Sequence, residues 1–169
     1  DNLPLKNFFL KKKIKKQQTY HSKKAGWLNV YKKYTKENIW PRGFALEKLN
    51  SPLPKKFRLL KVKCPIQQGL ADKNPDVDAI YRLTSKLPIS FSSSKSISLG
   101  NGSICPFNSQ NTGWLKEAFP LMYLPSFCSF RMTDIWRSFV AQRIAWTCGW
   151  SILFHGSSVI QERNKHDLI

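Results

Sequence analysis

The stretch Thr133-Asp-Ile-Trp-Arg-Ser-Phe-Val-Ala-Gln-Arg-Ile-Ala-Trp-Thr147, with Trp150-Ser-Ile-Leu-Phe154 after it, decides the fold class. Five apolar side chains recur in it at helical spacing: Ile135, Trp136, Phe139, Val140 and Ile144. They predict a helix over about 134–147 whose apolar face packs on a sheet. Gly149 is a suitable stop, and 150–154 reads as a buried strand. A helix followed by such a strand indicates an α/β fold.

Two side chains that could take part in catalysis lie at the ends of these elements. Thr133 is a suitable N-cap, and Asp134 lies in the first helical turn, where the helix dipole favours an anion. His155 follows the strand directly. Ligands in open α/β sheets bind beyond the carboxyl ends of the strands. We therefore expect Asp134 and His155 to line one cleft, although a capping carboxylate and a core histidine are equally good interpretations.

The rest of the chain gives weaker structural signals. Alternation predicts a strand near 57–62, and 89–99 is a serine-rich, strand-like passage closed by Gly100-Asn-Gly102. Asn111-Thr112 predicts the cap of a short helix that ends at Pro120, and 121–124 reads as a buried strand. Residues 79–83 form a short apolar-rich element, and the sequence pattern does not decide between helix and strand.

Composition narrows the class of protein. With 169 residues and 41% apolar residues, the chain is long enough for one globular domain, which we assign to 1–169. Its longest apolar run, 145–154, is too short to span a bilayer, so no transmembrane segment is expected. The four cysteines form no close pairs of the kind that structural zinc sites use.

Positive charge is concentrated in the first third of the chain. Residues 1–66 hold 18 Lys and Arg against 3 Asp and Glu, and so account for most of the net charge of +18. Tyr20, Trp27 and Tyr31 are interleaved with lysines in the basic segment 6–63. Such a pattern can bind nucleic acid. We favour a solvated lysine-rich surface with packing aromatics, and do not expect nucleic acid as a partner.

Standard catalytic and nucleotide-binding signatures are missing from the sequence. It has no G-x-x-x-x-G-K loop, no dinucleotide fingerprint, no G-x-S-x-G elbow and no H-E-x-x-H pair. Residue patterns alone therefore predict a basic α/β domain and no particular reaction.

A set of short segments along the whole chain carries a resemblance. They are Trp40-Pro-Arg-Gly-Phe44, Gln68-Gly-Leu-Ala-Asp72, Pro75-Asp-Val-Asp-Ala-Ile-Tyr-Arg-Leu-Thr84, Pro106-Phe-Asn-Ser-Gln-Asn-Thr112, Leu124-Pro125, Phe130-Arg131, Asp134-Ile135 and Gln161-Glu-Arg-Asn-Lys-His-Asp-Leu168. Together they resemble the STELLO-like family of glycosyltransferases and, more distantly, the reversibly glycosylated polypeptides of plants. Asp1-Asn-Leu-Pro4 looks like the tail of that family's aspartate-rich metal motif. The lysine tract at 11–16 has no counterpart in the resemblance.

The resemblance implies a fold and a reaction. The fold would be the C-terminal, acceptor-side portion of a GT-A-like nucleotide-diphospho-sugar transferase domain. The reaction would be transfer of a sugar from a nucleotide-sugar donor to a saccharide or other hydroxyl acceptor. A divalent metal, Mn²⁺ or Mg²⁺, would neutralise the leaving diphosphate, with Asp1 and His155 as ligands. Asp134 would be the general base. Such an enzyme would work in the cytoplasm of a bacterium or the Golgi of a eukaryote.

Substrate contacts follow from the same resemblance. Asp76, Asp78 and Arg131 are candidates for holding sugar hydroxyls, and Asp76 and Asp78 also suit a turn. Asn108-Ser109-Gln110-Asn111 places several hydrogen-bonding side chains before the expected helix, as a sugar pocket requires. An ordinary Asn/Ser turn has the same composition.

Two other functions stay open at this stage. The first is a non-catalytic scaffold of the same fold that partners a polysaccharide synthase. The second, less favoured, is a nucleic-acid-binding module that uses the basic segment. Because the metal motif looks truncated at Asp1, we expect that the donor-binding half lies upstream and that this piece is inactive alone.

Overall fold

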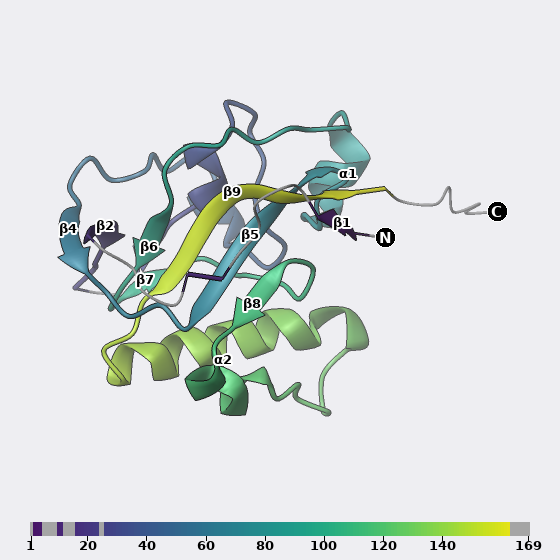
Figure 1. The fold of residues 1–169 in the computed structure, drawn as a ribbon. Helices are drawn as coiled ribbons and strands as arrows, with labels where there is room; N and C mark the ends of the chain where they lie inside the picture. Colours follow the sequence, from purple (N-terminus) through teal and green to yellow (C-terminus); the bar gives the residue numbers. More distant parts are fainter. Residues whose placement is uncertain (1, 5–9, 12–15, 24–25, 163–169) are drawn as a thin grey trace.

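The computed structural model describes residues 2–4, 10–11, 16–23 and 26–162, and it has the mixed α/β fold expected from the sequence (Figure 1). Within these residues seven strands form one sheet in the order β4-β2-β6-β9-β5-β8, and β1 pairs with the far end of β9. The bounds are β1 Asn2–Pro4, β2 Lys16–Tyr20, β4 Arg58–Lys61, β5 Ile66–Lys73, β6 Ile97–Leu99, β8 Thr112–Trp114 and β9 Ile152–Gln161.

The central strand is β9, which pairs with β5 in parallel and with β6 in the antiparallel sense. Its first residues, Ile152 to Phe154, are buried, because a strand with partners on both edges has both faces covered. The predicted strand is therefore confirmed, but its end is not. β9 continues for seven residues beyond Phe154, so His155 lies within the strand and not at its tip.

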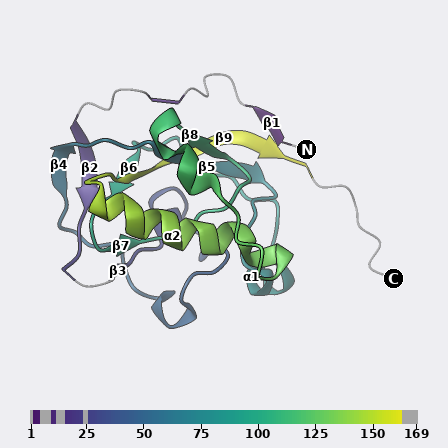
Figure 2. The ribbon, with the colours of Figure 1, turned by 90° about the horizontal axis from the view of Figure 1, so that it is seen from below.

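Helices and short turns complete the described chain. The two α-helices are α1 Ala79–Thr84 and α2 Thr133–Thr147. The 3-10 turns are η1 Val30–Lys33, η2 Leu46–Lys48, η3 Lys116–Met122 and η4 Phe130–Met132. A separate pair of short strands joins β3 Gly26–Trp27 to β7 Ser103–Ile104. Figure 2 shows α2 and the chain from β3 to η2 on one side of the sheet.

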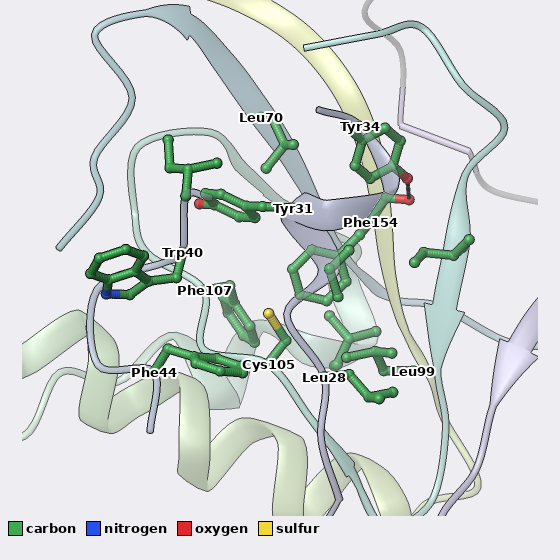
Figure 3. Close-up of a cluster of buried hydrophobic side chains, with 14 of the residues drawn as sticks. Leu28, Tyr31, Tyr34, Trp40, Phe44, Leu70, Leu99, Cys105, Phe107 and Phe154 are labelled. Carbon is green, nitrogen blue, oxygen red and sulfur yellow. Dashed lines mark hydrogen bonds between the residues drawn. The ribbon is translucent and has the colours of Figure 1, made fainter. Parts of the chain in front are cut away.

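The hydrophobic core fills the space between that side of the sheet and these segments. Figure 3 shows Tyr31, Tyr34 and Phe107 packed around Phe154 of β9. The Tyr34 hydroxyl donates a hydrogen bond of 2.9 Å to the Phe154 carbonyl. Aromatic residues of the basic segment are thus part of the core, which agrees with the packing interpretation of their spacing.

The predicted helix is confirmed as α2, but its predicted packing face is wrong. Trp136, Val140 and Ile144 are 52%, 56% and 39% exposed, and among the five apolar residues only Ile135 is fully buried. The helix instead buries small and hydrogen-bonded residues: Arg137, Ser138, Ala141, Gln142 and Ala145. The small size of Ser138, Ala141 and Ala145 brings the helix close to the core, and the buried side chains of Ser138 and Gln142 have hydrogen-bond partners. The Gln142 Oε1, for example, accepts from the Cys105 N–H at 3.1 Å.

Local predictions outside α2 succeeded only in part. The strand near 57–62 is confirmed as β4, and the 89–99 passage contains β6 at its end. The predicted helix after Asn111 is wrong, because Thr112–Trp114 pairs with β5 as β8 and the chain then enters η3. The predicted strand at 121–124 is also wrong, since it is the end of η3 and an exposed loop. Thr133 does not cap α2 with its side chain, and its hydroxyl donates to the Phe130 carbonyl.

Gly43 provides a test of how the 40–44 turn docks on α2. Its φ is +79°, and a Cβ there would come within 2.5 Å of the Ile135 Cγ2. Gly149 also has a positive φ, +66°, but nothing lies within 4 Å of its Cβ position. We expect Gly149→Ala to lower the free energy of unfolding by about 1 kcal/mol, from the backbone alone. Gly43→Ala adds a steric clash and should cost roughly 2–4 kcal/mol. Urea unfolding measures both, and equal losses would contradict the docking.

Candidate functional site

Arg42 lies at the centre of a cluster of charged residues, in which it pairs with both Asp76 and Asp134. It projects from the Pro41–Phe44 turn, between the loop before α1 and the first turn of α2. One guanidinium nitrogen, Nη2, contacts the Asp76 Oδ2 at 2.8 Å and both carboxylate oxygens of Asp134 at 3.0 Å. The other, Nη1, donates to the Arg131 carbonyl. One side chain therefore joins three segments that are far apart in the sequence.

Asp134 is fully occupied by this arrangement. Its Oδ1 accepts from Arg42 and from the Ile135 N–H at 3.0 Å, and its Oδ2 accepts from Arg42 and from the Ser109 N–H at 3.1 Å. A carboxylate has about four lone-pair positions. All of them are used, and the side chain is only 14% exposed. The geometry is that of a carboxylate that fixes the start of α2.

Asp76 is less constrained than Asp134. Its side chain is 23% exposed, and Arg42 contacts only its Oδ2. Its backbone is held more firmly, because its N–H donates to the Gln110 side chain at 3.0 Å and its carbonyl accepts from Asn108 at 3.1 Å. Asp78, by contrast, caps α1 by accepting from the Ile80 N–H. Of the two aspartates that contact Arg42, Asp76 has the more exposed carboxylate, 23% against 14% for Asp134.

The predicted sugar-binding segment 108–111 divides between two locations. Asn108 is 4% exposed and bonds the Asp76 backbone, so it orders the loop around the carboxylate pair. Asn111 is 7% exposed and donates to the Leu70 carbonyl and the Ser158 hydroxyl. Both amides are therefore engaged within the protein. Ser109 is exposed, and its hydroxyl accepts from Arg137 at 2.7 Å.

Arg137 is a second arginine of this site that the sequence did not single out. It lies one turn along α2 from Asp134 and is 7% exposed. Its guanidinium stacks over the Trp114 ring, 5.1 Å from the centroid. Burial lowers the pKa of Arg137, and Asp134 opposes that shift. The site thus combines two carboxylates and two arginines at the start of α2.

His155 lies on the other side of the sheet from this cluster. Its neighbour Phe154 packs into the core together with Ala141 and Ala145 of α2. Successive side chains of a strand point to opposite faces, so His155 points away from α2. It lines a cavity to which Asp134 does not contribute. The structure therefore does not bring Asp134 and His155 together in one cleft, because β9 continues as a strand through position 155.

The surroundings of His155 do not suit a divalent cation. Lysines at 11, 16 and 95 line the same cavity, and no acidic residue is among its described lining. Burial lowers the pKa of His155 to about 4; the hydrogen bond of its ring to the Gly156 carbonyl opposes that shift, and the charge of Lys11 adds a smaller lowering. No cluster of three or more metal-ligand residues occurs among the described residues. Asp1, the other predicted ligand, lies outside them, and so its role stays a prediction.

Two further features bear on partners. Tyr20, Tyr31, Tyr34 and Trp40 are each at most 6% exposed, and so cannot offer their faces to nucleic-acid bases. In the part of the chain that the structure describes, no helix has the length and hydropathy needed to cross a membrane.

Comparison with known proteins gives two relatives from Arabidopsis thaliana. One is named "Probable glycosyltransferase STELLO2", with 32% identity over 130 residues, and the other "Probable glycosyltransferase STELLO1", with 31% identity over 130 residues. The chain belongs to the STELLO-like family. Each match covers 72% of the chain but only 17% of the relative. No profile of a known protein family matches the chain.

Sequence reasoning found the STELLO-like segments but missed the residue that joins them. Arg42 stands inside Trp40-Pro-Arg-Gly-Phe44, and that segment was given no role beyond the resemblance. Asp76 and Asp134 each lie in another of the quoted segments. An arginine in one such segment and aspartates in two others are the signal that could have suggested the cluster.

Breaking the Arg42 cluster should destabilise the fold. Arg42→Met leaves Asp76 and Asp134 close together and without their shared cation, so we expect a loss of roughly 2–4 kcal/mol in the free energy of unfolding. As a control, Glu117→Gln breaks the exposed pair with Lys63 and should leave the unfolding midpoint unchanged. A similarly small effect of both substitutions in urea unfolding would contradict a structural role for Arg42.

His155 should make stability depend on pH. Its folded pKa of about 4 is lower than the ordinary value of 6.5, so the unfolded chain binds the proton more readily. The contribution is complete above pH 6.5 and is lost as the pH falls towards 4, by up to about 3 kcal/mol. His155→Gln should remove that part of the pH dependence between 6.5 and 4, as measured by denaturant unfolding at several pH values. An unchanged pH profile in the variant would be inconsistent with a buried neutral imidazole.

Proposed function

We propose that this chain forms the acceptor side of a GT-A-like glycosyltransferase, which moves a sugar from a nucleotide-sugar donor to a hydroxyl acceptor. The proposal is supported by the relatives described as glycosyltransferases. Within the structure it rests on one observation, the convergence of Asp76 and Asp134 on Arg42. Because the match spans a sixth of the relatives, the activity belongs to the full-length protein.

The reaction needs a group that accepts a proton. In the transfer, the bond from the anomeric carbon to the donor phosphate oxygen breaks, and the diphosphate leaves with the electron pair. A bond forms between that carbon and the acceptor oxygen, whose proton must go to a base. A carboxylate with an available oxygen in a fixed position can serve as this base. Asp76 is such a carboxylate, because Arg42 contacts its side chain and the side chains of Asn108 and Gln110 hold its backbone.

Within the pair, the geometry favours Asp76 as the base. Arg42 and two backbone N–H groups occupy the lone pairs of Asp134, whereas contacts from the described residues reach only one oxygen of Asp76. Asp134 would then position Arg42, and Arg42 would position Asp76. The sequence-based assignment of the base to Asp134 is the competing version, and it requires Arg42 or Ser109 to release an oxygen when the acceptor binds. Asn108, Gln110 and Arg131 would order the surrounding loop and η4, not contact the sugar.

The Mn²⁺ or Mg²⁺ cofactor remains a prediction of the family resemblance. The described residues around His155 carry positive charge and do not fit a cation. No step of the proposed reaction is therefore assigned to a metal held by His155. Asp1, the other predicted ligand, lies outside the described residues.

A non-catalytic scaffold is the second candidate, and the outer surface of α2 favours it. Phe127 and Phe130 are essentially fully exposed, and Trp136 and Val140 are more than half exposed beside them. Exposed apolar groups in such numbers are typical of an interaction surface. A full-length protein that binds a polysaccharide synthase but transfers no sugar would support the scaffold.

Substitution of each carboxylate by its amide separates the two versions of the site. In the full-length protein we expect Asp76→Asn to lower kcat by at least roughly 10²-fold with little change in stability, as for loss of a general base. Asp134→Asn should mainly lower the unfolding midpoint. Initial rates with a labelled nucleotide sugar, together with thermal unfolding, measure both effects.

The converse result would assign the base to Asp134: a 10²-fold loss of kcat in Asp134→Asn at unchanged stability, with Asp76→Asn fully active. Asp78→Asn serves as a control, because Asp78 caps α1 and does not contact the cluster. If both Asp76→Asn and Asp134→Asn keep full activity, the acceptor site lies elsewhere.

A further inference from the structure

The cavity beside His155 has a volume of about 710 Å³. Its lining comes from β2, from β9, from the loop that precedes β6, and from Phe57 and Leu59 next to or within β4. Small-molecule sites commonly have volumes of about 300–1,000 Å³. The cavity therefore has room for a small molecule, and it lies on the sheet face away from α2.

The chemistry of the lining is strongly one-sided. Lys11, Lys16 and Lys95 bring three formal positive charges, and the described lining has no Asp or Glu to balance them. Five serines add hydroxyl groups: Ser93, Ser94, Ser96, Ser157 and Ser158. Lysine ammonium groups and hydroxyls are donors that bind phosphate oxygens. A concave surface of one sign also raises the local concentration of ions of the opposite sign.

Contacts within the protein hold the cavity walls in place. The buried Gln67 side chain accepts from the Lys11 N–H at 3.0 Å and donates to the Lys11 carbonyl at 2.8 Å. The Lys11 ammonium donates to the Ser96 hydroxyl at 3.2 Å, and the Gln17 side chain donates to the Ser96 carbonyl. These bonds tie the N-terminal segment to the 93–96 loop. A preformed site binds its ligand without the entropic cost of ordering its walls.

The approach of the serine loop to β9 depends on a glycine. A Cβ at Gly156 would come within 2.4 Å of the Ser92 carbonyl oxygen. The Ser92 N–H donates to the Tyr34 carbonyl at 2.7 Å, which anchors the start of the loop to the core. The serines at 93–96 are therefore presented to the cavity by a closely packed backbone.

We propose that this cavity binds the phosphate group of a phosphorylated small molecule. The ammonium groups of Lys16 and Lys95 contact the phosphate oxygens, and the serine hydroxyls of the 93–96 loop donate to the same oxygens. Phe57 and Leu59 provide an apolar wall for the rest of the ligand. The site goes beyond the proposed sugar transfer, since it lies on the opposite sheet face from Asp76 and Asp134.

Calorimetric titration of the full-length protein tests the proposal. Inorganic phosphate, inorganic pyrophosphate and glucose 6-phosphate are titrated separately at about 0.15 M salt, where diffuse ion association is screened. We expect the double variant Lys16→Gln/Lys95→Gln to bind the tightest of these probes at least roughly 10-fold more weakly, since each lost contact is charge-assisted. The order of the three affinities identifies a monophosphate, a diphosphate or an organic phosphate as the preferred chemistry.

A charge-matched control makes the test specific. Lys48→Gln/Lys86→Gln removes the same two charges from exposed positions outside the cavity, and should change the affinity by less than about 2-fold. If the double variant is unfolded by circular dichroism, Lys95→Gln alone, in a loop, should still weaken binding about 3-fold or more. The proposal is overturned if the wild-type protein binds none of the probes, or if the cavity and control variants lose affinity equally. Neither result affects the sugar-transfer proposal, which depends on rates in the Asp76 and Asp134 variants.

Discussion

The fold and the candidate site both depend on the position of one guanidinium group. Arg42 contacts Asp76 and Asp134 at 2.8–3.0 Å, and so connects the 40–44 turn, the loop before α1 and the start of α2. Without a shared cation, two carboxylates this close would repel each other. The turn that carries Arg42 docks on α2 through Gly43, whose φ of +79° and close contact with Ile135 leave no room for a side chain. The first turn of α2 is thus held both by the ion pair of Asp134 with Arg42 and by the buried Ile135, and the rest of the helix packs small residues such as Ala141 and Ala145 against the core.

The sheet separates two regions of different chemistry. On the α2 side, two carboxylates and two arginines meet at the start of the helix, where the carboxylates accept hydrogen bonds. On the other side, three lysines and several serines surround a cavity suited to an anion. The strand β9 contributes to both regions, with Phe154 facing the core and His155 facing the cavity. The proposed acceptor site and the proposed anion site therefore lie on opposite faces of this sheet.

Sequence patterns predicted the positions of helices and strands better than they predicted which side of each helix or strand is buried. The helix predicted at about 134–147 and the strand predicted at 150–154 correspond to α2 and to the beginning of β9, because both are apolar-rich runs. The buried side of α2 did not follow, since the burial of Gln142 depends on a backbone partner at Cys105 that is 37 residues away. The strand starts two residues later than predicted, and its pairing with β5 carries it past His155, which no local pattern shows. The family resemblance located the segments of the site, whereas the ion pairs that join them are contacts between distant residues and needed the structure.

The central claim is that Arg42 and Asp134 act as one unit, and a double-mutant cycle tests it most directly. The free energy of unfolding would be measured for the wild type, Arg42→Met, Asp134→Asn and the double variant. If the pair is coupled, removing both partners should cost less than the sum of the single losses, with an interaction energy of about 1–3 kcal/mol. Additive losses, within about 0.5 kcal/mol, would contradict the claim and leave the carboxylate cluster without its organising contact.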